Sequence, residues 1–321
     1  MRLRLVPKDT KWDFFKTSTL TMGLSALLMV ASVVLFFMQG LNYGIDFKGG
    51  TTIRTDAAVS VDVGGYRDAI APLGLGDVSI TQVTDPTKPD LNVTQIKIEA
   101  QEGDEAITSA TIAKIKAALQ AYEPSITFAA VESVGPKVSG ELVWTAVESV
   151  IAAIVAVLFY IWLRFEWQFS VGAVAALVHD VVLTIGIFSL VQIKFDLAII
   201  AALLTIVGYS LNDTVVVFDR VRENLRKFKK LSLKDVLNLS INETLSRTVM
   251  TSVTTLIALV SLFVLGGDVI RGFVFAMIWG VIVGTYSSVF VASAILLRLG
   301  VKRDWSKQNP EAGGQFANID A

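Results

Sequence analysis

The sequence predicts a polytopic α-helical membrane protein with six transmembrane helices and one small soluble α+β domain. Of its 321 residues, 53% are hydrophobic and only 18% are charged, and the mean hydropathy is +0.60. A soluble domain of this length does not need so much apolar sequence in long uninterrupted runs. The apolar residues form six runs of about 20 residues or more, the length of helix that crosses a hydrocarbon core. The main polar stretch lies between the first two runs.

The composition also excludes several kinds of site. Cysteine is absent and histidine occurs once, at His179, so disulfides, thiolate metal sites and His-cluster metal sites are excluded. The sequence contains no nucleotide-binding motif and no pairing of a nucleophile with a base outside the apolar runs. We therefore expect no enzyme activity, no cofactor and no metal.

The first apolar run, 18–40, follows a basic N-terminal segment, 1–17, and in this respect it is similar to a signal peptide. Its apolar stretch is too long for a signal peptide, however, and Met38-Gln39-Gly40 is a poor cleavage site. We expect the run to be retained as a true span.

The distribution of basic residues predicts the topology. The segment 1–17 carries five Lys or Arg, 220–247 carries eight, and the tail 298–321 carries four. The positive-inside rule places these segments, and so both termini, in the cytoplasm. The expected membrane region 141–297 then holds five spans and a cytoplasmic loop at 220–246. Those spans are expected at 141–163, 169–191, 197–219, 245–265 and 271–297.

Residues 41–140 form the expected outer domain. The pattern predicts four strands and two helices in the order βαββαβ, which is typical of a ferredoxin-like unit. Thirteen acidic and eight basic residues give the domain a mildly acidic balance, which argues against binding to nucleic acid. The strands are expected at 44–55, 77–84, 93–100 and 125–134, and the helices at 60–73 and 104–121.

Two glycine-bounded junctions connect this domain to the membrane region, "GIDFKGG" (44–50) and "VGPKVSG" (134–140). Glycine adopts backbone angles that other residues avoid, so the favoured interpretation is a structural elbow. A hinge that lets the domain move is the alternative, and anion binding is disfavoured because no phosphate-loop pattern is present. The candidate junction residues are Gly44, Asp46, Gly49, Gly50, Gly135 and Pro136.

A carboxylate, Asp213, lies inside the fourth apolar run, "IVGYSLNDTVVVFDR". Placing it there costs about 2.5–3.5 kcal/mol on insertion scales. Arg247 begins the fifth run, and its long side chain has the reach to meet Asp213. The favoured interpretation is a proton relay made by Asp213 and Arg247, and the alternative is a static ion pair that holds two helices together.

Other polar residues inside the spans are secondary candidates, and polar side chains between membrane helices often serve only in packing. His179 and Asp180 are adjacent, so their side chains are expected to point in different directions. Glu148 is interpreted as facing a water-filled cleft near the outer boundary. The secondary candidates are Glu148, His179, Asp180 and Asn212.

Two further patterns predict packing. Gly280 and Gly284 have the spacing that permits close contact between membrane helices. The segment 231–246 has an apolar face and a basic leader, which predicts a helix lying on the inner membrane surface, in contact with anionic lipid. Docking to a partner is the alternative for that segment.

Several strings together resemble the SecF family of the bacterial SecD–SecF protein-export complex, within the resistance-nodulation-division (RND) superfamily. The resemblance implies an RND-like inner-membrane protein with six spans and a periplasmic domain. It also implies proton-driven assistance to export, with Asp213 and Arg247 as the charged span residues. Implied partners are a SecD-like subunit, the SecYEG channel, YajC, YidC and an exported unfolded protein. The strings are "GIDFKGG", "VGP", "FEWQFSVGAVAALVHD", "GYSLNDTVVVFDRVREN", "SRTVMTSVTTLIALVSLFVLGG" and "GTYSSVFVASAIL".

Two other functions remain open from the sequence. A small-molecule or lipid exporter of the same superfamily shares the relay, but such exporters usually have larger outer domains. A scaffold of the translocon without energy transduction is the second alternative, and it predicts that joint neutral replacement of Asp213 and Arg247 is tolerated.

Overall fold

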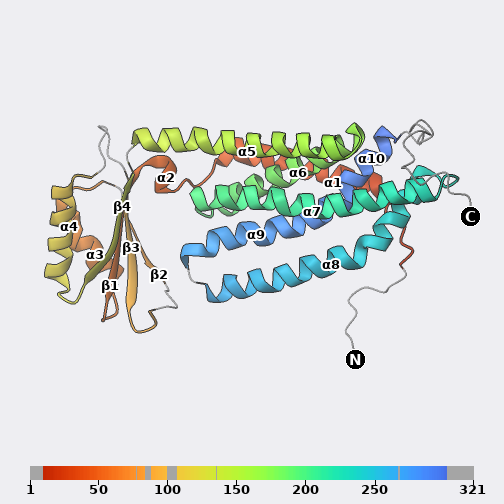
Figure 1. Cartoon of the computed structure of the whole chain (residues 1–321). Helices are drawn as coiled ribbons and strands as arrows, with labels where there is room; N and C mark the ends of the chain where they lie inside the picture. The colour runs from red at the N-terminus through yellow and green to blue at the C-terminus, as the bar shows by residue number, and fades with distance from the viewer. Residues whose placement is uncertain are drawn as a thin grey trace, which may run out of the picture.

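The computed structural model is a bundle of long helices with a sheet domain at one end (Figure 1). It describes residues 10–76, 78–83, 88–99, 107–134, 136–266 and 268–301. Six helices are long and apolar enough to cross a membrane, which confirms the six predicted spans. We call the two ends of the bundle the domain end, next to the sheet, and the far end.

The helices of the bundle divide into a central and a peripheral group. α6, α7 and the last span, which contains α9, are the most buried, whereas few residues are buried in α1, α5 and the apolar part of α8. The first residues of α1 and the whole of α10 lie at the far end (Figure 1). The elements are α1 (Ser18–Gln39), α5 (Pro136–Arg164), α6 (Trp167–Val191), α7 (Leu197–Lys227), α8 (Leu233–Leu265), α9 (Asp268–Ser287), the π-helical turn η2 (Ser288–Ala292) and α10 (Ser293–Leu299).

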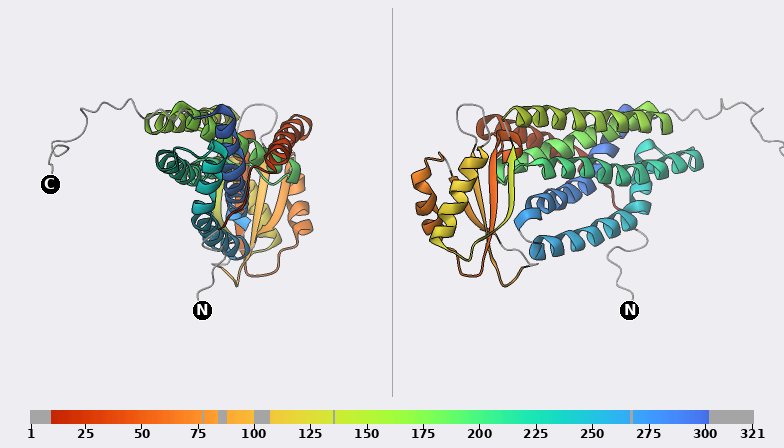
Figure 2. Two further views of the ribbon diagram at one scale, coloured as in Figure 1. Left: turned by 90° about the vertical axis from the view of Figure 1, so that its right-hand side faces the viewer. Right: turned by 60° about the vertical axis from the view of Figure 1, so that its left-hand side comes forward.

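The sheet domain has the predicted βαββαβ order and is ferredoxin-like. Its four strands pair antiparallel in the order β2-β3-β1-β4. Two helices cover one face (Figure 2), where Ile53, Ile96 and Ile98 of the strands pack on Ile115 and Leu119. The elements are β1 (Gly50–Ala57), α3 (Val63–Ile70), the 3₁₀ turn η1 (Ala71–Leu73), β2 (Val78–Val83), β3 (Asn92–Glu99), α4 (Ser109–Tyr122) and β4 (Thr127–Val134).

The strand expected at 44–55 begins later than predicted. A short helix, α2 (Ile45–Lys48), comes first, and β1 begins at Gly50. Gly49 and Gly50 have φ angles of 77° and 139°, a region that side chains with a Cβ rarely adopt. The glycine pair therefore makes the turn from α2 into the sheet, and the alternation seen in the sequence starts only after it.

The segment expected as a loop at 220–246 is helical except at 228–232, which joins α7 to α8. The prediction of a separate helix on the membrane surface is wrong, because that segment is the first half of α8. Its apolar face, with Val236, Leu237 and Ile241, is buried in the protein core with Phe15 and Leu225. An amphipathic face can pack on protein as well as on lipid, and periodicity alone does not distinguish the two.

Candidate functional site

Asp213 lies near the middle of α7 with its side chain buried, and its Oδ2 atom has no hydrogen-bond partner among the described residues. Arg247 is exposed on α8, within electrostatic range of Asp213. The predicted direct contact is wrong, since no ion pair within 4.0 Å joins the two residues in the described part of the chain. α8 instead turns Thr248 and Ser252 inward, and their helical spacing leaves Arg247 beside the buried face.

A second carboxylate, Asp180 of α6, is the centre of a buried polar network. Its Oδ2 accepts hydrogen bonds from the hydroxyl groups of Ser210 on α7 (2.6 Å) and Ser287 on α9 (2.8 Å). Its Oδ1 lies 2.9 Å from Nδ1 of His179. All four side chains are buried, so three central helices share one polar contact at the middle of the membrane region.

His179 connects this network to α1. Its ring stacks on Tyr286 of α9 with a centroid distance of 6.2 Å. The Tyr286 hydroxyl donates to the Thr21 carbonyl oxygen (2.9 Å) and lies 3.0 Å from the Ser25 hydroxyl oxygen. The expectation that His179 and Asp180 point apart is wrong, since the Asp180 side chain turns back to meet the ring.

The two glycines of α9 bring the network together, which confirms their predicted role in packing. A Cβ on Gly280 would lie 2.3 Å from Ile206 Cγ1, and one on Gly284 would lie 3.1 Å from Ser210 Cβ. α9 therefore rests directly on α7 at these two turns. One turn further along α9, Ser287 reaches Asp180.

The other secondary candidates stay outside this network. Glu148 on α5 and Asn212 on α7 are both exposed. Ser287 and Tyr286 were not predicted from the sequence, although they lie in "GTYSS". The spacing of Gly280 and Gly284 could have indicated Ser287, because a residue one turn after Gly284 lies on the same face of the helix.

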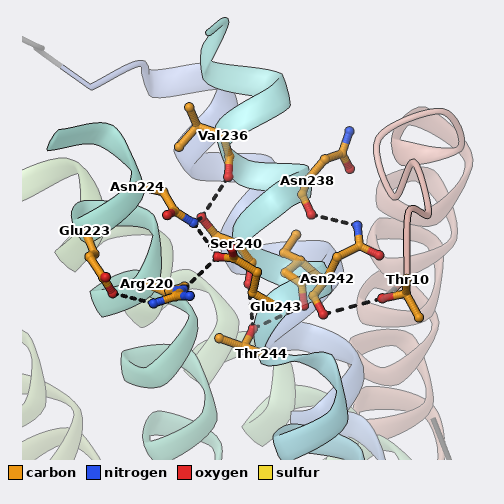
Figure 3. Close-up of polar contacts among 11 residues, drawn as sticks. Thr10, Arg220, Glu223, Asn224, Val236, Asn238, Ser240, Asn242, Glu243 and Thr244 are labelled. Atoms are coloured by element: carbon orange, nitrogen blue, oxygen red, sulfur yellow. Dashed lines mark hydrogen bonds and ion pairs between the residues drawn. The ribbon is translucent and has the colours of Figure 1, made fainter. Parts of the chain in front are cut away.

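A second polar network joins α7 to α8 at the far end (Figure 3). The side-chain amide of Asn224 donates to Ser240 Oγ (3.1 Å) and to Glu243 Oε2 (2.6 Å). Arg220 donates to the same Glu243 oxygen (2.7 Å) and to Glu223 Oε2 (2.6 Å). Because Asn224 and Ser240 are buried, this network fixes the far ends of the two helices that carry Asp213 and Arg247.

The segment before α1 is bound to the same part of α8. The Trp12 backbone exchanges two hydrogen bonds with the Asn242 side chain, at 3.0 and 2.9 Å. One turn away, Asn238 accepts from the Phe14 amide at 3.0 Å. Figure 3 shows a further contact from Thr10 to Asn242. Two asparagines in successive turns of α8 therefore hold residues 12–14, at the start of the turn that leads into α1, against α8.

At the domain end, the junction residues are bound to the connection between α6 and α7. The Gly44 amide donates to the Phe195 carbonyl oxygen, and the Phe195 amide donates to that of Asn42, both at 2.7 Å. Asp46 Oδ2 accepts from the Leu197 amide at 3.1 Å. Leu197 is the first residue of α7, so α2 is attached to the start of the helix that carries Asp213. Gly135 lies outside the described residues, and Pro136 is the first residue of α5.

The uncovered face of the sheet forms a polar cleft with the domain end of the bundle. The cleft has a volume of about 440 Å³. Lys97 of β3 is half-buried there, within hydrogen-bonding reach of Lys194, with Asp196 and Asp46 nearby. Burial first, and then Lys194, lower the pKa of Lys97 to about 7. Glu132 of β4 and Arg271 of α9 are the other charged residues that line the cleft.

This contact predicts that docking of the sheet domain depends on pH. The docked state favours neutral Lys97, because its pKa there lies below the ordinary value of 10.5. Docking is therefore strongest above about pH 10.5, weakens as the pH falls, and reaches its weakest level below about pH 7. We expect the distance between spin labels at S79C and V264C to broaden from pH 9 to pH 6.

The broadening should disappear in Lys97→Met, which keeps the length of the side chain and removes its charge. Lys114→Met is the matched control, because Lys114 is exposed on α4, and it should leave the broadening intact. The chain has no cysteine of its own, so the labels attach only at the introduced positions. A label distance in Lys97→Met that still broadens at low pH would contradict this account.

No group of three or more His, Cys, Asp or Glu side chains that could hold a metal ion occurs in the ranges that the structure describes. The polar groups of the Asp180 network are a carboxylate, an imidazole and hydroxyl groups. These groups take up, share and release protons.

Known proteins are similar to this chain in sequence. Residues 114–302 match the family described as protein export membrane protein SecD/SecF, C-terminal, and residues 34–58 match the SecD/SecF GG motif. The chain is 59% identical over 321 residues to protein translocase subunit SecF of Cereibacter sphaeroides, covering 100% of this chain and 99% of that one. It is 41% identical to the same-named protein of Calditerrivibrio nitroreducens, covering 92% and 96%.

The fold is also similar to solved structures. A crystal structure of SecDF from Thermus, described as a translocon-associated membrane protein, matches with a TM-score of 0.78 and 36% identity. A structure of SecDF in a super-membrane-facing form matches with a TM-score of 0.68 and 37% identity. Each match covers 93% of this chain and 40% of the longer SecDF chain.

Proposed function

This chain belongs to the SecD/SecF family of protein-export membrane proteins, and from that premise we propose that it acts as a SecF-type subunit that assists the Sec translocase with energy from the proton motive force. It is a multi-pass membrane protein and a transport subunit rather than an enzyme. The observation that carries the proton-driven part is Asp213, a buried carboxylate in α7 with one oxygen that has no hydrogen-bond partner within the described ranges. An ionisable residue at membrane depth is by default a candidate for a proton or ion pathway.

The proposed mechanism starts at Asp213. The charged form is attracted by Arg247, and the neutral form is cheaper to bury, so protonation changes the position of α7 relative to α8. The polar network around Asn224 fixes the far ends of these helices. The displacement of α7 relative to α8 is therefore largest toward the domain end, where α7 begins.

The junction carries this motion to the sheet domain. Asp46 binds the first amide of α7, and the turn at Gly49 and Gly50 links α2 to β1. A displacement of α7 pulls on α2 and tilts the sheet about this glycine pair, so we propose that the junction is a hinge. One of the two solved SecDF structures that this chain resembles is described as a super-membrane-facing form.

We place the protein in the bacterial inner membrane, with both termini in the cytoplasm and the sheet domain in the periplasm. The concentration of Lys and Arg in 1–17, 220–247 and 298–321 supports this orientation. The SecF names of the relatives and the SecDF names of the solved structures support a SecD-like partner. The SecYEG channel, YajC and YidC, membrane lipid and an exported unfolded protein complete the proposed assembly.

Affinity purification of the full chain from its native membrane tests the assembly. We expect a SecD-like subunit and components of the Sec channel to co-purify in mild detergent. A complex that holds a second copy or another membrane protein but no secretion component would contradict the proposal and favour an exporter of small molecules or lipids. Membranes from cells that express the same chain without the tag serve as the control for nonspecific capture.

A further inference from the structure

We propose that His179 and Asp180 form a second proton-binding site, in which the unpaired Nε2 atom of His179 takes up the proton. The inference rests on the proposed function, because a proton-driven subunit needs a path through its central helices. It goes further by assigning the middle of that path to α6, α7 and α9.

The hydrogen bonds show which groups are available. The Ser210 and Ser287 hydroxyl groups donate to Oδ2 of Asp180. In the tautomer of His179 that carries the proton on Nδ1, that nitrogen donates to Oδ1, and the carboxylate accepts three bonds. This pattern satisfies a charged Asp180. Among the residues that the structure describes, the one side-chain polar atom of this pair without a hydrogen-bond partner is the buried His179 Nε2. An unprotonated imidazole nitrogen without a hydrogen-bond donor beside it has a free lone pair, to which a proton can bind.

The net charge favours the uptake. Neutral His179 and charged Asp180 together carry one negative charge, and both side chains are 1% exposed. An uncompensated charge in such surroundings is costly, and a proton on Nε2 turns the pair into a buried ion pair with no net charge. The proton comes from water and returns to water, so the only chemical change at the site is whether Nε2 carries a proton.

The geometry favours a proton over a sodium ion. A sodium site needs several oxygen atoms arranged around an empty centre. Here both serine hydroxyl groups already bond to the carboxylate at 2.6 and 2.8 Å, which are ordinary hydrogen-bond lengths. The space between the oxygens is therefore taken up by hydrogen atoms.

The site lies close to Asp213 along α7. Ser210 and Asp213 lie three residues apart on α7, about 4.5 Å along the helix axis, and side chains with this spacing are neighbours. The titratable groups in contact with His179 are Asp180 on its own helix and Tyr286 on α9. Asp213 on α7 lies three residues from Ser210, which donates to Asp180. From α1 it is the uncharged Ser25 that approaches, through Tyr286.

Nuclear magnetic resonance of the full chain tests the proposal, because the chain contains a single histidine. With ¹⁵N-labelled histidine in lipid nanodiscs, one pair of ring signals belongs to His179. We expect Nε2 to change from an unprotonated to a protonated shift between about pH 9 and pH 5, while Nδ1 stays protonated. Ring signals that stay constant over this range would overturn the proposal. A titration that appears only with sodium would overturn it as well.

Two variants separate proton uptake from packing. His179→Asn keeps a donor at the place of Nδ1 and removes Nε2, whereas His179→Gln keeps an amide nearer the place of Nε2. We expect His179→Asn in the assembled complex to be membrane-inserted but to lose most of the dependence of export on the proton gradient. A His179→Asn complex with the full dependence would overturn the proposal.

The variant Asp213→Asn distinguishes this inference from the proposed function. If export in Asp213→Asn loses its response to the gradient while His179 in the native chain does not titrate, the proposed function stands and the second site falls. If His179 titrates and Asp213→Asn exports normally, the second site stands and the relay at Asp213 falls.

Discussion

Replacing Asp213 with Asn is expected to abolish the stimulation of protein export by the proton gradient while leaving the fold intact. Asn has nearly the same shape and remains neutral, so α7 loses the change of charge that drives it. One charge moved through 100 mV supplies about 2.3 kcal/mol, equal to about a 50-fold bias of an equilibrium. Export into membrane vesicles with and without a gradient measures the effect, with the amount of inserted protein determined in parallel.

Asp219→Asn is the matched control for this prediction. Asp219 lies on the same helix but is exposed, 3.8 Å from Arg164, and exposed ion pairs contribute little. We expect Asp219→Asn to export as the native chain does. The double variant Asp213→Asn/Arg247→Gln examines the scaffold alternative. If it restored full gradient-dependent export, the relay would be refuted and a purely structural role supported.

Replacing Gly280 with Ala is expected to separate α9 from α7 and to lower the stability of the bundle by about 1–3 kcal/mol, the range for overpacked cores. The added Cβ would lie 2.3 Å from Ile206 Cγ1, and Ile206 is fully buried. A branched side chain has few alternative rotamers in a helix, so the helices must move. Thermal unfolding in detergent, followed by tryptophan fluorescence, measures the loss.

Two further variants make this prediction specific. Gly208→Ala adds the same methyl group to α7 where no atom lies within 4 Å, and we expect it to leave the unfolding temperature nearly unchanged or to raise it slightly. Ile206→Ala combined with Gly280→Ala provides the missing space. The double variant should recover part of the loss, a coupling that contacting residues show. Simple addition of the two losses would contradict direct packing of Gly280 on Ile206.

Much of the architecture was predictable because the membrane imposes strong rules on sequence. Long apolar runs predicted the six spans, and the alternation of polar and apolar residues predicted the βαββαβ order. The predictions of local detail were wrong where one sequence pattern is compatible with two different structures. The run 44–55 holds a helix, a glycine turn and a strand, and the apolar face of 231–246 packs on protein where lipid was expected.

The candidate site was predictable in part. The apolar neighbours of Asp213 mark it as a buried carboxylate, and the structure places it inside the bundle. The absence of a direct contact between Asp213 and Arg247 was not predictable, because the direction of a side chain on α8 depends on how that helix is rotated about its axis. For the same reason, the contact of Asp180 with Ser210 and Ser287 was not predictable. These two serines lie 30 and 107 residues after Asp180 in the sequence.

The sequence by itself determined that this chain spans a membrane six times, that a small α+β domain follows the first span, and that carboxylates lie at lipid depth. These properties depend on composition and local periodicity, which the chain carries wherever it folds. Only the tertiary structure decided which polar groups meet, because the close approach of α7 and α9 at Gly280 and Gly284 sets the rotation and height of three helices together. That packing brings His179, Asp180 and Ser287 into one network, and Arg247 is not part of it.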